Sequence, residues 1–169
     1  MLLGVLAIVY VVNGFSHAIL LRYASPFGLG FQVLGLACAW VCDSAALVAG
    51  SLFGQTKLAP AISPGKTVAG AVAGVVASAL TALALFSLSR SSGQWLLPSA
   101  PVVEQLALGL SLGVLCVAGD LVESYLKRVA DVKDSGAFFP GHGGCLDRMD
   151  SFLFVAQALF YYSLYRFQA

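Results

Sequence analysis

The sequence predicts an all-α polytopic membrane protein, a bundle of about five transmembrane helices. Hydrophobic residues make up 59% of the 169 residues and charged residues only 10%, whereas an average soluble domain has roughly 25% charged residues. The mean hydropathy is +0.89. Five stretches stay mostly apolar over about the 20 residues that a membrane-spanning helix needs. This composition excludes a water-soluble globular protein, and a net charge of only +1 argues against nucleic acid as a partner.

The five apolar stretches follow one another without an internal repeat or a domain linker, so we expect one integral-membrane domain over residues 1–169. They cover residues 2–21, 28–53, 67–89, 102–126 and 151–167. The third stretch carries no charge, and Gly70 and Gly74 within it are four positions apart. Small residues at this spacing let two helices approach closely, so we interpret this pattern as helix packing.

Polar side chains inside the first two stretches need partners, because lipid offers them no hydrogen bonds. We expect Asn13, Ser16 and His17 in the first stretch to form hydrogen bonds between helices. Asp43 lies near the middle of the second stretch, where a carboxylate is costly unless it faces the bundle interior, water or a partner. We interpret Asp43 as a functional residue, with a hydrogen-bonded or protonated structural role as the alternative.

The distribution of lysine and arginine predicts the orientation in the membrane. With five spans, the connections after the second and fourth lie on the same side, and they hold Lys57, Lys66, Lys127, Arg128, Lys133 and Arg148. The opposite side holds Arg22, Arg90 and Arg166. Because short cytoplasmic connections carry an excess of Lys and Arg, we expect the first set, and the N-terminus, on the cytoplasmic side.

The end of the fourth stretch delivers acidic and basic side chains to one helix face. Asp120, Glu123 and Lys127 are three and four positions apart, the spacing that aligns side chains along a helix. Asp147 and Asp150 repeat the three-residue spacing just before the fifth stretch. A salt-bridged helix end is the structural alternative for one such pair. Two acid pairs that flank a single loop at the same membrane boundary favour a functional site.

The chemistry of this boundary suits a metal-bound polyphosphate. Clustered carboxylates bind a hard cation such as Mg²⁺, which is usually shared with substrate phosphates. Neighbouring cations supply positive charge for the phosphates, namely Lys127, Arg128, Lys133 and Arg148. The glycine-rich segment between the acid pairs lets backbone amides approach an anion at Pro140, Gly141, His142, Gly143 and Gly144. Ser63 and Lys66 precede the third stretch, where they contact phosphate or, equally, belong to a helix cap with Ser63 ahead of Pro64.

These residues resemble a known family. The run from Ser124 through Lys127-Arg128 and Pro140-Gly141-His142-Gly143-Gly144 to Asp147-Arg148-Met149-Asp150 is similar to the long, specific signature of phosphatidate cytidylyltransferases, also called CDP-diacylglycerol synthases. Segments 43–54 and 57–67 agree with the same family. The resemblance extends roughly from residue 40 to the C-terminus. We expect the chain to correspond to the C-terminal catalytic part of the family, N-terminally truncated relative to its bacterial members.

The resemblance implies transfer of a cytidylyl group from CTP to phosphatidic acid, giving CDP-diacylglycerol and pyrophosphate in phospholipid biosynthesis. It places this activity at the cytoplasmic face of a bacterial plasma membrane. Catalytic roles fall to Asp120, Lys127, Asp147 and Asp150, of which Asp120, Asp147 and Asp150 would bind Mg²⁺, with a second cation left open. Substrate-binding roles fall to Asp43, Ser63, Lys66, Glu123, Arg128, Lys133, His142, Gly143, Gly144 and Arg148. We expect CTP, phosphatidic acid and the lipid bilayer as partners, no nucleic acid, and leave a homodimer open.

Three alternatives differ from this interpretation. The chain could be a CTP-dependent cytidylyltransferase for another lipid phosphate, or an inactive truncated subunit that pairs with a partner through its small-residue faces. An ion or proton transporter could use Asp43, Asp120 and Glu123 as a relay. A transporter has no evident use for the loop of Lys, Gly and His residues between the acid pairs, so we disfavour it.

Overall fold

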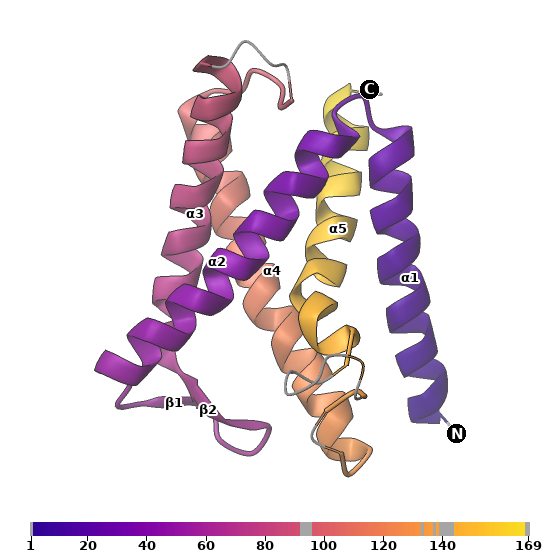
Figure 1. Ribbon diagram of the computed structural model, residues 1–169, viewed down its shortest axis with the longest axis vertical. Coiled ribbons are helices and arrows are strands. Elements are labelled where there is room, and N and C mark those ends of the chain that lie inside the picture. Colours follow the sequence, from indigo (N-terminus) through magenta and orange to yellow (C-terminus); the bar gives the residue numbers. More distant parts are fainter. Residues whose placement is uncertain (1, 92–95, 133, 137, 139–143, 168–169) are drawn as a thin grey trace.

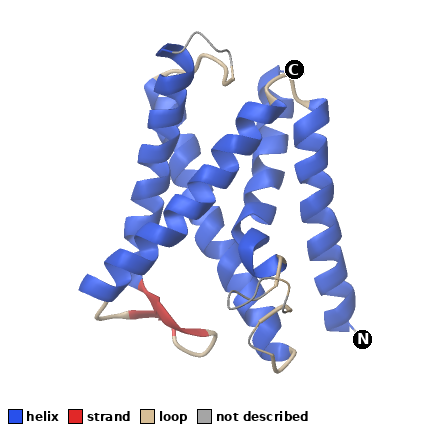
Figure 2. Cartoon of the chain, in the orientation of Figure 1, coloured by secondary structure: helices blue, strands red, loops and turns tan. Residues whose placement is uncertain are grey.

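The computed structural model describes residues 2–91, 96–132, 134–136, 138 and 144–167. These residues form five helices and one short hairpin of two strands (Figure 2). In chain order the elements are α1 (Leu2–Ala24), α2 (Gly28–Phe53), β1 (Lys57–Ala59), β2 (Ser63–Thr67), α3 (Val68–Ser91), α4 (Val102–Val129) and α5 (Leu146–Phe167). The prediction of a helical bundle is confirmed, and each of the five predicted stretches lies within one helix, except that the third begins one residue early.

The helices run up and down, so that the two ends of the chain lie at opposite ends of the bundle (Figure 1). The β1–β2 hairpin, the end of α4 and the start of α5 all lie at the same end as the N-terminus (Figure 1). This confirms that the connections after the second and fourth helices share one side. α2 crosses the bundle obliquely, while α5 lies between α4 and α1 (Figure 1).

Four helices are long and apolar enough to cross a membrane, as judged by length and composition: α1 from Gly4, α2, α3 and α4. This makes the chain a polytopic membrane protein. α5 falls outside this set. Its first turns contain Asp147, Arg148 and Asp150, and its last turn contains Arg166. α5 packs against α1, α2 and α4, so protein side chains rather than lipid surround much of it, and residues such as Leu153 and Leu159 are fully buried.

The small residues of α3 allow close packing against α2, as the spacing of Gly70 and Gly74 predicts. A Cβ atom at Gly70 would lie 2.6 Å from the carbonyl oxygen of Ala46, and one at Gly74 would lie 2.9 Å from that of Cys42. Either methyl group would have to displace backbone, because neither oxygen can rotate away. The two glycines therefore hold the start of α3 beside α2, next to the hairpin.

The hairpin corrects the interpretation of Ser63 as a helix cap. Strands β1 and β2 pair antiparallel, with Lys57 opposite Thr67 and Ala59 opposite Ser63. Extended backbone through Thr67 delays the start of α3 to Val68. Thr67 takes the capping role instead, because its Oγ1 accepts a hydrogen bond of 3.1 Å from the Gly70 N–H.

Candidate functional site

A cavity of about 580 Å³ opens at the hairpin end of the bundle. Five elements contribute to its wall: α2, the β1–β2 hairpin, the first turn of α3, α4 and the first turn of α5. The lining includes apolar residues such as Ala46, Leu47, Leu58, Ala71 and Val117. It also includes the charged residues Asp43, Lys57, Lys66, Asp120, Asp147 and Asp150. The cavity therefore offers both apolar and charged contacts to a ligand.

Three carboxylates from two helices converge beside this cavity. Asp120 and Glu123 come from one face of α4 and Asp150 from the start of α5, and one oxygen from each lies within 4.8 Å of the others. The approach of α5 to α4 depends on Gly119, where a Cβ atom would lie 2.9 Å from the backbone oxygen of Asp150. Glu123 and Asp150 are buried. The two predicted acid pairs thus meet, as the sequence spacing indicates.

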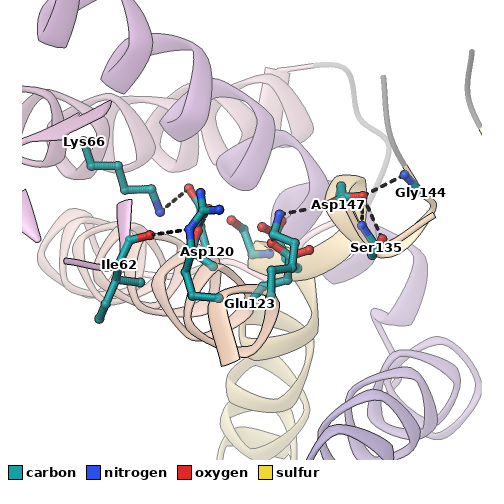
Figure 3. Close-up of polar contacts among 12 residues, drawn as sticks. Ile62, Lys66, Asp120, Glu123, Ser135, Gly144 and Asp147 are labelled. Carbon is teal, nitrogen blue, oxygen red and sulfur yellow. Dashed lines mark hydrogen bonds and ion pairs between the residues drawn. The ribbon is translucent and has the colours of Figure 1, made fainter. Parts of the chain in front are cut away.

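Two lysines form ion pairs with carboxylates of the site (Figure 3). Lys66, from β2, places its Nζ 2.5 Å from Asp120 Oδ2. Lys127, one turn after Glu123 on α4, places its Nζ 2.6 Å from Glu123 Oε2 and 2.7 Å from Asp147 Oδ1. Asp120 on α4 thereby holds Lys66 at the site. Lys127 is held by Glu123, one turn earlier on α4, and by Asp147 on α5.

Asp147 uses its second oxygen to organise the chain that precedes α5 (Figure 3). Its Oδ2 accepts hydrogen bonds from the Ser135 N–H at 2.9 Å, the Ser135 hydroxyl at 2.7 Å and the Gly144 N–H at 2.7 Å. Partial burial acts to raise the pKa of this carboxyl, but the bonds from Lys127, Ser135 and Gly144 outweigh it and hold the pKa well below its ordinary value. Asp147 is therefore an anion that ties α4, the loop and α5 together.

The donor set of Asp120, Glu123 and Asp150 fits a hard divalent cation such as Mg²⁺. Each residue offers an oxygen ligand, the kind that Mg²⁺ prefers. Glu123 is 1% exposed, and its Oε1 has no hydrogen-bond partner among the residues that the structure describes. A buried carboxylate oxygen without a partner is costly, and a cation would satisfy it. The structure brings Asp120 and Asp150 together as expected and adds Glu123, whereas the role of Asp147 as a metal ligand stays a prediction.

The remaining predicted residues divide into three groups. Asp43 and Ser63 line the cavity with Lys66. Arg128 and Arg148 lie outside the cavity lining formed by the described residues, and Arg128 Nε instead donates a hydrogen bond of 3.2 Å to the Ile62 carbonyl, which ties the hairpin turn to α4. The predictions for Lys133, His142 and Gly143, with Pro140 and Gly141, fall outside the described residues.

Sequence reasoning missed several residues that shape the site. Lys57 lines the cavity from β1, and its place after the second helix is a weak signal that could have indicated this. Tyr10 donates a hydrogen bond of 3.0 Å from its hydroxyl to the backbone carbonyl of Asp150. The two residues are separated by 140 positions, so no local pattern connects them. Tyr10 thus braces the start of α5 from α1, a helix with no residue in the cavity lining among those described.

The fold and site together define a polytopic membrane protein with an acid- and lysine-lined cavity at one end of its helix bundle. The model of the cytidylyltransferase family matches residues 1–166, and the chain belongs to this family. It is 43% identical to the phosphatidate cytidylyltransferase of Bacillus subtilis over 92% of this chain and 55% of the relative. It is also 42% identical to the enzymes of that name from Synechocystis, over 81% of this chain and 44% of the relative, and Brucella suis, over 84% and 49%. The chain spans about half the length of these relatives.

Proposed function

We propose that this chain carries the catalytic part of a phosphatidate cytidylyltransferase, which transfers a cytidylyl group from CTP to phosphatidic acid. The observation that carries the proposal is the junction of α4 and α5, where Asp120, Glu123 and Asp150 meet beside Lys66 and Lys127. Membership of the cytidylyltransferase family and the names of the relatives support the same reaction. In this reaction a phosphate oxygen of phosphatidic acid attacks the α-phosphorus of CTP, and pyrophosphate leaves.

The cavity lining matches the two parts of a lipid phosphate. Its apolar residues, such as Leu47, Leu58 and Val117, suit the acyl part of a lipid, and its charged residues suit the phosphate. The attacking phosphate monoester has a second pKa near 6 and is largely a dianion at neutral pH. The nucleophile therefore needs no general base, and catalysis reduces to positioning and charge neutralisation.

We assign separate roles to the acids and the lysines. Asp120, Glu123 and Asp150 would hold Mg²⁺, with Asp147 as the further ligand that the resemblance implies. The bound cation would neutralise negative charge on the CTP phosphates. Lys66 and Lys127, already held at the cavity by ion pairs, would bind phosphate oxygens directly. Asp147 orients Lys127 through their 2.7 Å contact.

We also propose that the cavity faces the cytoplasm in the plasma membrane. The hairpin and the α4–α5 junction lie at the same end of the bundle (Figure 1), and the connections at this end hold six Lys and Arg residues against three at the other. A cysteine introduced at Ser99, in the α3–α4 connection, should react with an impermeant thiol reagent only from outside intact cells. Labelling of that cysteine from the cytoplasm alone would reverse the orientation.

A direct assay tests the reaction. Purified protein reconstituted in lipid, with labelled CTP, phosphatidic acid and Mg²⁺, should form labelled CDP-diacylglycerol, and Asp120→Asn should abolish the product. Glu104→Gln is the matched control, because it removes a carboxylate at the opposite end of α4. Binding of CTP without turnover by a folded sample would instead identify an inactive subunit. Faster turnover with a different lipid phosphate in the same assay would reassign the substrate.

A further inference from the structure

The carboxylate of Asp150 is fixed to the backbone of its own helix. Its Oδ1 accepts a hydrogen bond of 2.7 Å from the N–H of Ser151, and the side chain is buried. A buried side chain that is bonded to its own main chain has little freedom to change its rotamer. The place of the Asp150 carboxylate beside Asp120 and Glu123 therefore depends on where the first turns of α5 lie.

The backbone of α5 at this point is held from two neighbouring helices. On the α4 side, Ser151 Oγ donates a hydrogen bond of 3.2 Å to the carbonyl of Cys116, and Gly119 lets the two backbones approach closely. On the α1 side, the hydroxyl of Tyr10 donates a hydrogen bond of 3.0 Å to the carbonyl of Asp150. Because α5 lies between α4 and α1 (Figure 1), the contacts from both helices together fix the position of this peptide group.

Tyr10 is itself held against α5 by packing. Its ring contacts that of Phe154, with the ring centroids 5.6 Å apart. One turn later on α1, a Cβ atom at Gly14 would lie 2.7 Å from Leu153 Cβ, so the two helices approach closely here. A helix carbonyl has a second lone pair, so that of Asp150 can accept the phenol besides an N–H of its own helix. Packing thus places the Tyr10 hydroxyl at this carbonyl.

A second hydroxyl contact joins α1 to α5 away from the acids. The Tyr161 hydroxyl bonds His17 Nε2 at 3.2 Å, about three helical turns along α5 from the acid cluster. This contact confirms the helix-to-helix hydrogen bond expected for His17, whereas the side chains of Asn13 and Ser16 form none among the described residues. Both phenols join the same two helices, but only Tyr10 bonds a residue of the acid cluster. A purely structural role would make the two contacts equivalent.

We infer that Tyr10 is a positioning residue for Asp150: its hydroxyl holds the Asp150 carbonyl and thereby sets where the Asp150 carboxylate lies relative to the other two acids. The inference rests on the proposed function, because it takes Asp120, Glu123 and Asp150 as ligands of a divalent cation. Mg²⁺ requires near-ideal geometry of its oxygen ligands, and groups that orient a ligand typically change metal affinity about ten- to hundredfold. α1 thereby contributes to the site, although none of its described residues lines the cavity.

Titration of the reconstituted protein with Mn²⁺, followed by electron paramagnetic resonance, tests this role without any turnover. Mn²⁺ takes the same kinds of oxygen ligand as Mg²⁺. Tyr10→Phe removes only the hydroxyl, and the dissociation constant for Mn²⁺ should rise about tenfold. Tyr161→Phe is the matched control, because it removes a hydroxyl from the same helix pair away from the acids, and its constant should match that of wild type. An unchanged constant for Tyr10→Phe, or an equal rise in both variants, would overturn the inference.

Activity measurements separate this inference from the proposed reaction. Tyr10→Phe should raise the Mg²⁺ concentration for half-maximal cytidylyl transfer about tenfold and leave kcat at saturating Mg²⁺ nearly unchanged, whereas a loss of folded protein would lower kcat and leave that concentration unchanged. Weaker Mn²⁺ binding by Tyr10→Phe, with no turnover by wild type, would overturn the reaction and support the positioning role. Turnover by wild type, with unchanged Mn²⁺ affinity in Tyr10→Phe, would overturn the positioning role alone. Folded wild-type protein that binds no Mn²⁺ would also overturn it.

Discussion

Two polar clusters join α4 to α5, one at each end of the bundle, and they differ in how completely their charges are satisfied. At the end away from the cavity, Glu104 Oε1 accepts hydrogen bonds from the Tyr162 hydroxyl at 2.7 Å and from Arg166 Nε at 3.2 Å. At the cavity end, the carboxylates of Asp120, Glu123, Asp147 and Asp150 gather around Lys66 and Lys127. In the Glu104 cluster each oxygen contact joins the acid to a donor on α5, whereas the cavity cluster concentrates negative charge.

The difference supports the proposal that the cavity cluster binds a ligand. A lone acid with two donors needs nothing further, so the Glu104 cluster has a sufficient explanation in holding two helices together. The cavity cluster places carboxylates within 4.8 Å of one another and leaves Glu123 Oε1 without a hydrogen-bond partner among the described residues. Like charges at this distance oppose folding unless a cation joins them. The excess of acid is therefore best understood as a binding property.

Removal of one acid from each cluster gives the largest expected contrast. Glu123→Gln keeps the size of the side chain but removes the charge of one proposed metal ligand, so cytidylyl transfer should fall by about a hundredfold or more. Glu104→Gln should change the rate less than about twofold. Turnover of labelled CTP by equal amounts of folded protein measures both. Comparable losses of activity in the two variants would mean that the cavity cluster has no special role in the reaction.

Removal of one cation from each cluster should separate their contributions to stability. Lys127→Met leaves the buried Glu123 without its partner at 2.6 Å, and we expect the free energy of unfolding to fall by about 3 kcal/mol. Arg166→Met removes a partly exposed pair at 3.2 Å, which is worth at most about 1 kcal/mol. Chemical unfolding in mixed micelles compares them. An equal or larger loss of unfolding free energy for Arg166→Met would show that the partly exposed Arg166–Glu104 pair contributes more to stability than the Lys127–Glu123 pair.

A methyl group on α4 should reveal whether the close approach of α5 serves the site. Gly119→Ala places a Cβ atom 2.9 Å from the Asp150 carbonyl oxygen, so it should cost about 1–3 kcal/mol of stability. It should also lower activity about tenfold or more by moving Asp150. Gly109→Ala is the matched control, since its Cβ atom would lie 2.7 Å from Ala79 Cα but far along α4 from the acids. It should lose similar stability and keep its activity per folded molecule.

The smallest expected effect concerns pH. Because hydrogen bonds and the ion pair with Lys127 depress the pKa of Asp147, its contribution to stability is complete above the ordinary carboxyl pKa of about 3.9 and declines as the pH falls further. The gap in thermal unfolding temperature between wild type and Asp147→Asn should be constant from about pH 7 to pH 5. It should narrow below about pH 4. A gap that narrows already between pH 7 and pH 5 would mean that Asp147 is not held as an anion.

The sequence predicts the helices well where apolar length decides, and less well where charge marks a helix end. α2 matches its predicted limits, because its apolar run ends cleanly at Phe53 before Gly54. α5 begins at Leu146, five residues before the apolar run at Ser151, because its first turn is polar and resembles a loop in the sequence. The sequence does not predict the hairpin either, because its strands have only three and five residues and lack an alternation of apolar and polar residues.

The same contrast holds for the site. The spacing of Asp120 and Glu123 on one helix face, and of Asp147 and Asp150 before the next helix, predicts two acid pairs at one membrane boundary. It cannot predict that Glu123 rather than Asp147 lies nearest to Asp120 and Asp150, because that depends on how α5 is rotated against α4. The sequence does not predict the roles of Tyr10 and Ser135 for the same reason, since each forms a hydrogen bond to an acidic residue that is not its neighbour in the sequence.

The sequence by itself therefore determined the membrane class, the order of the helices and the acidic and basic residues that meet at one end. Composition and local periodicity suffice for these, because lipid requires apolar length and a helix aligns residues three and four apart. Only the tertiary structure decided which carboxylates converge and which lysines they hold. Those outcomes depend on close approach at Gly70, Gly74 and Gly119, where the packing of two backbones sets the position of every side chain nearby.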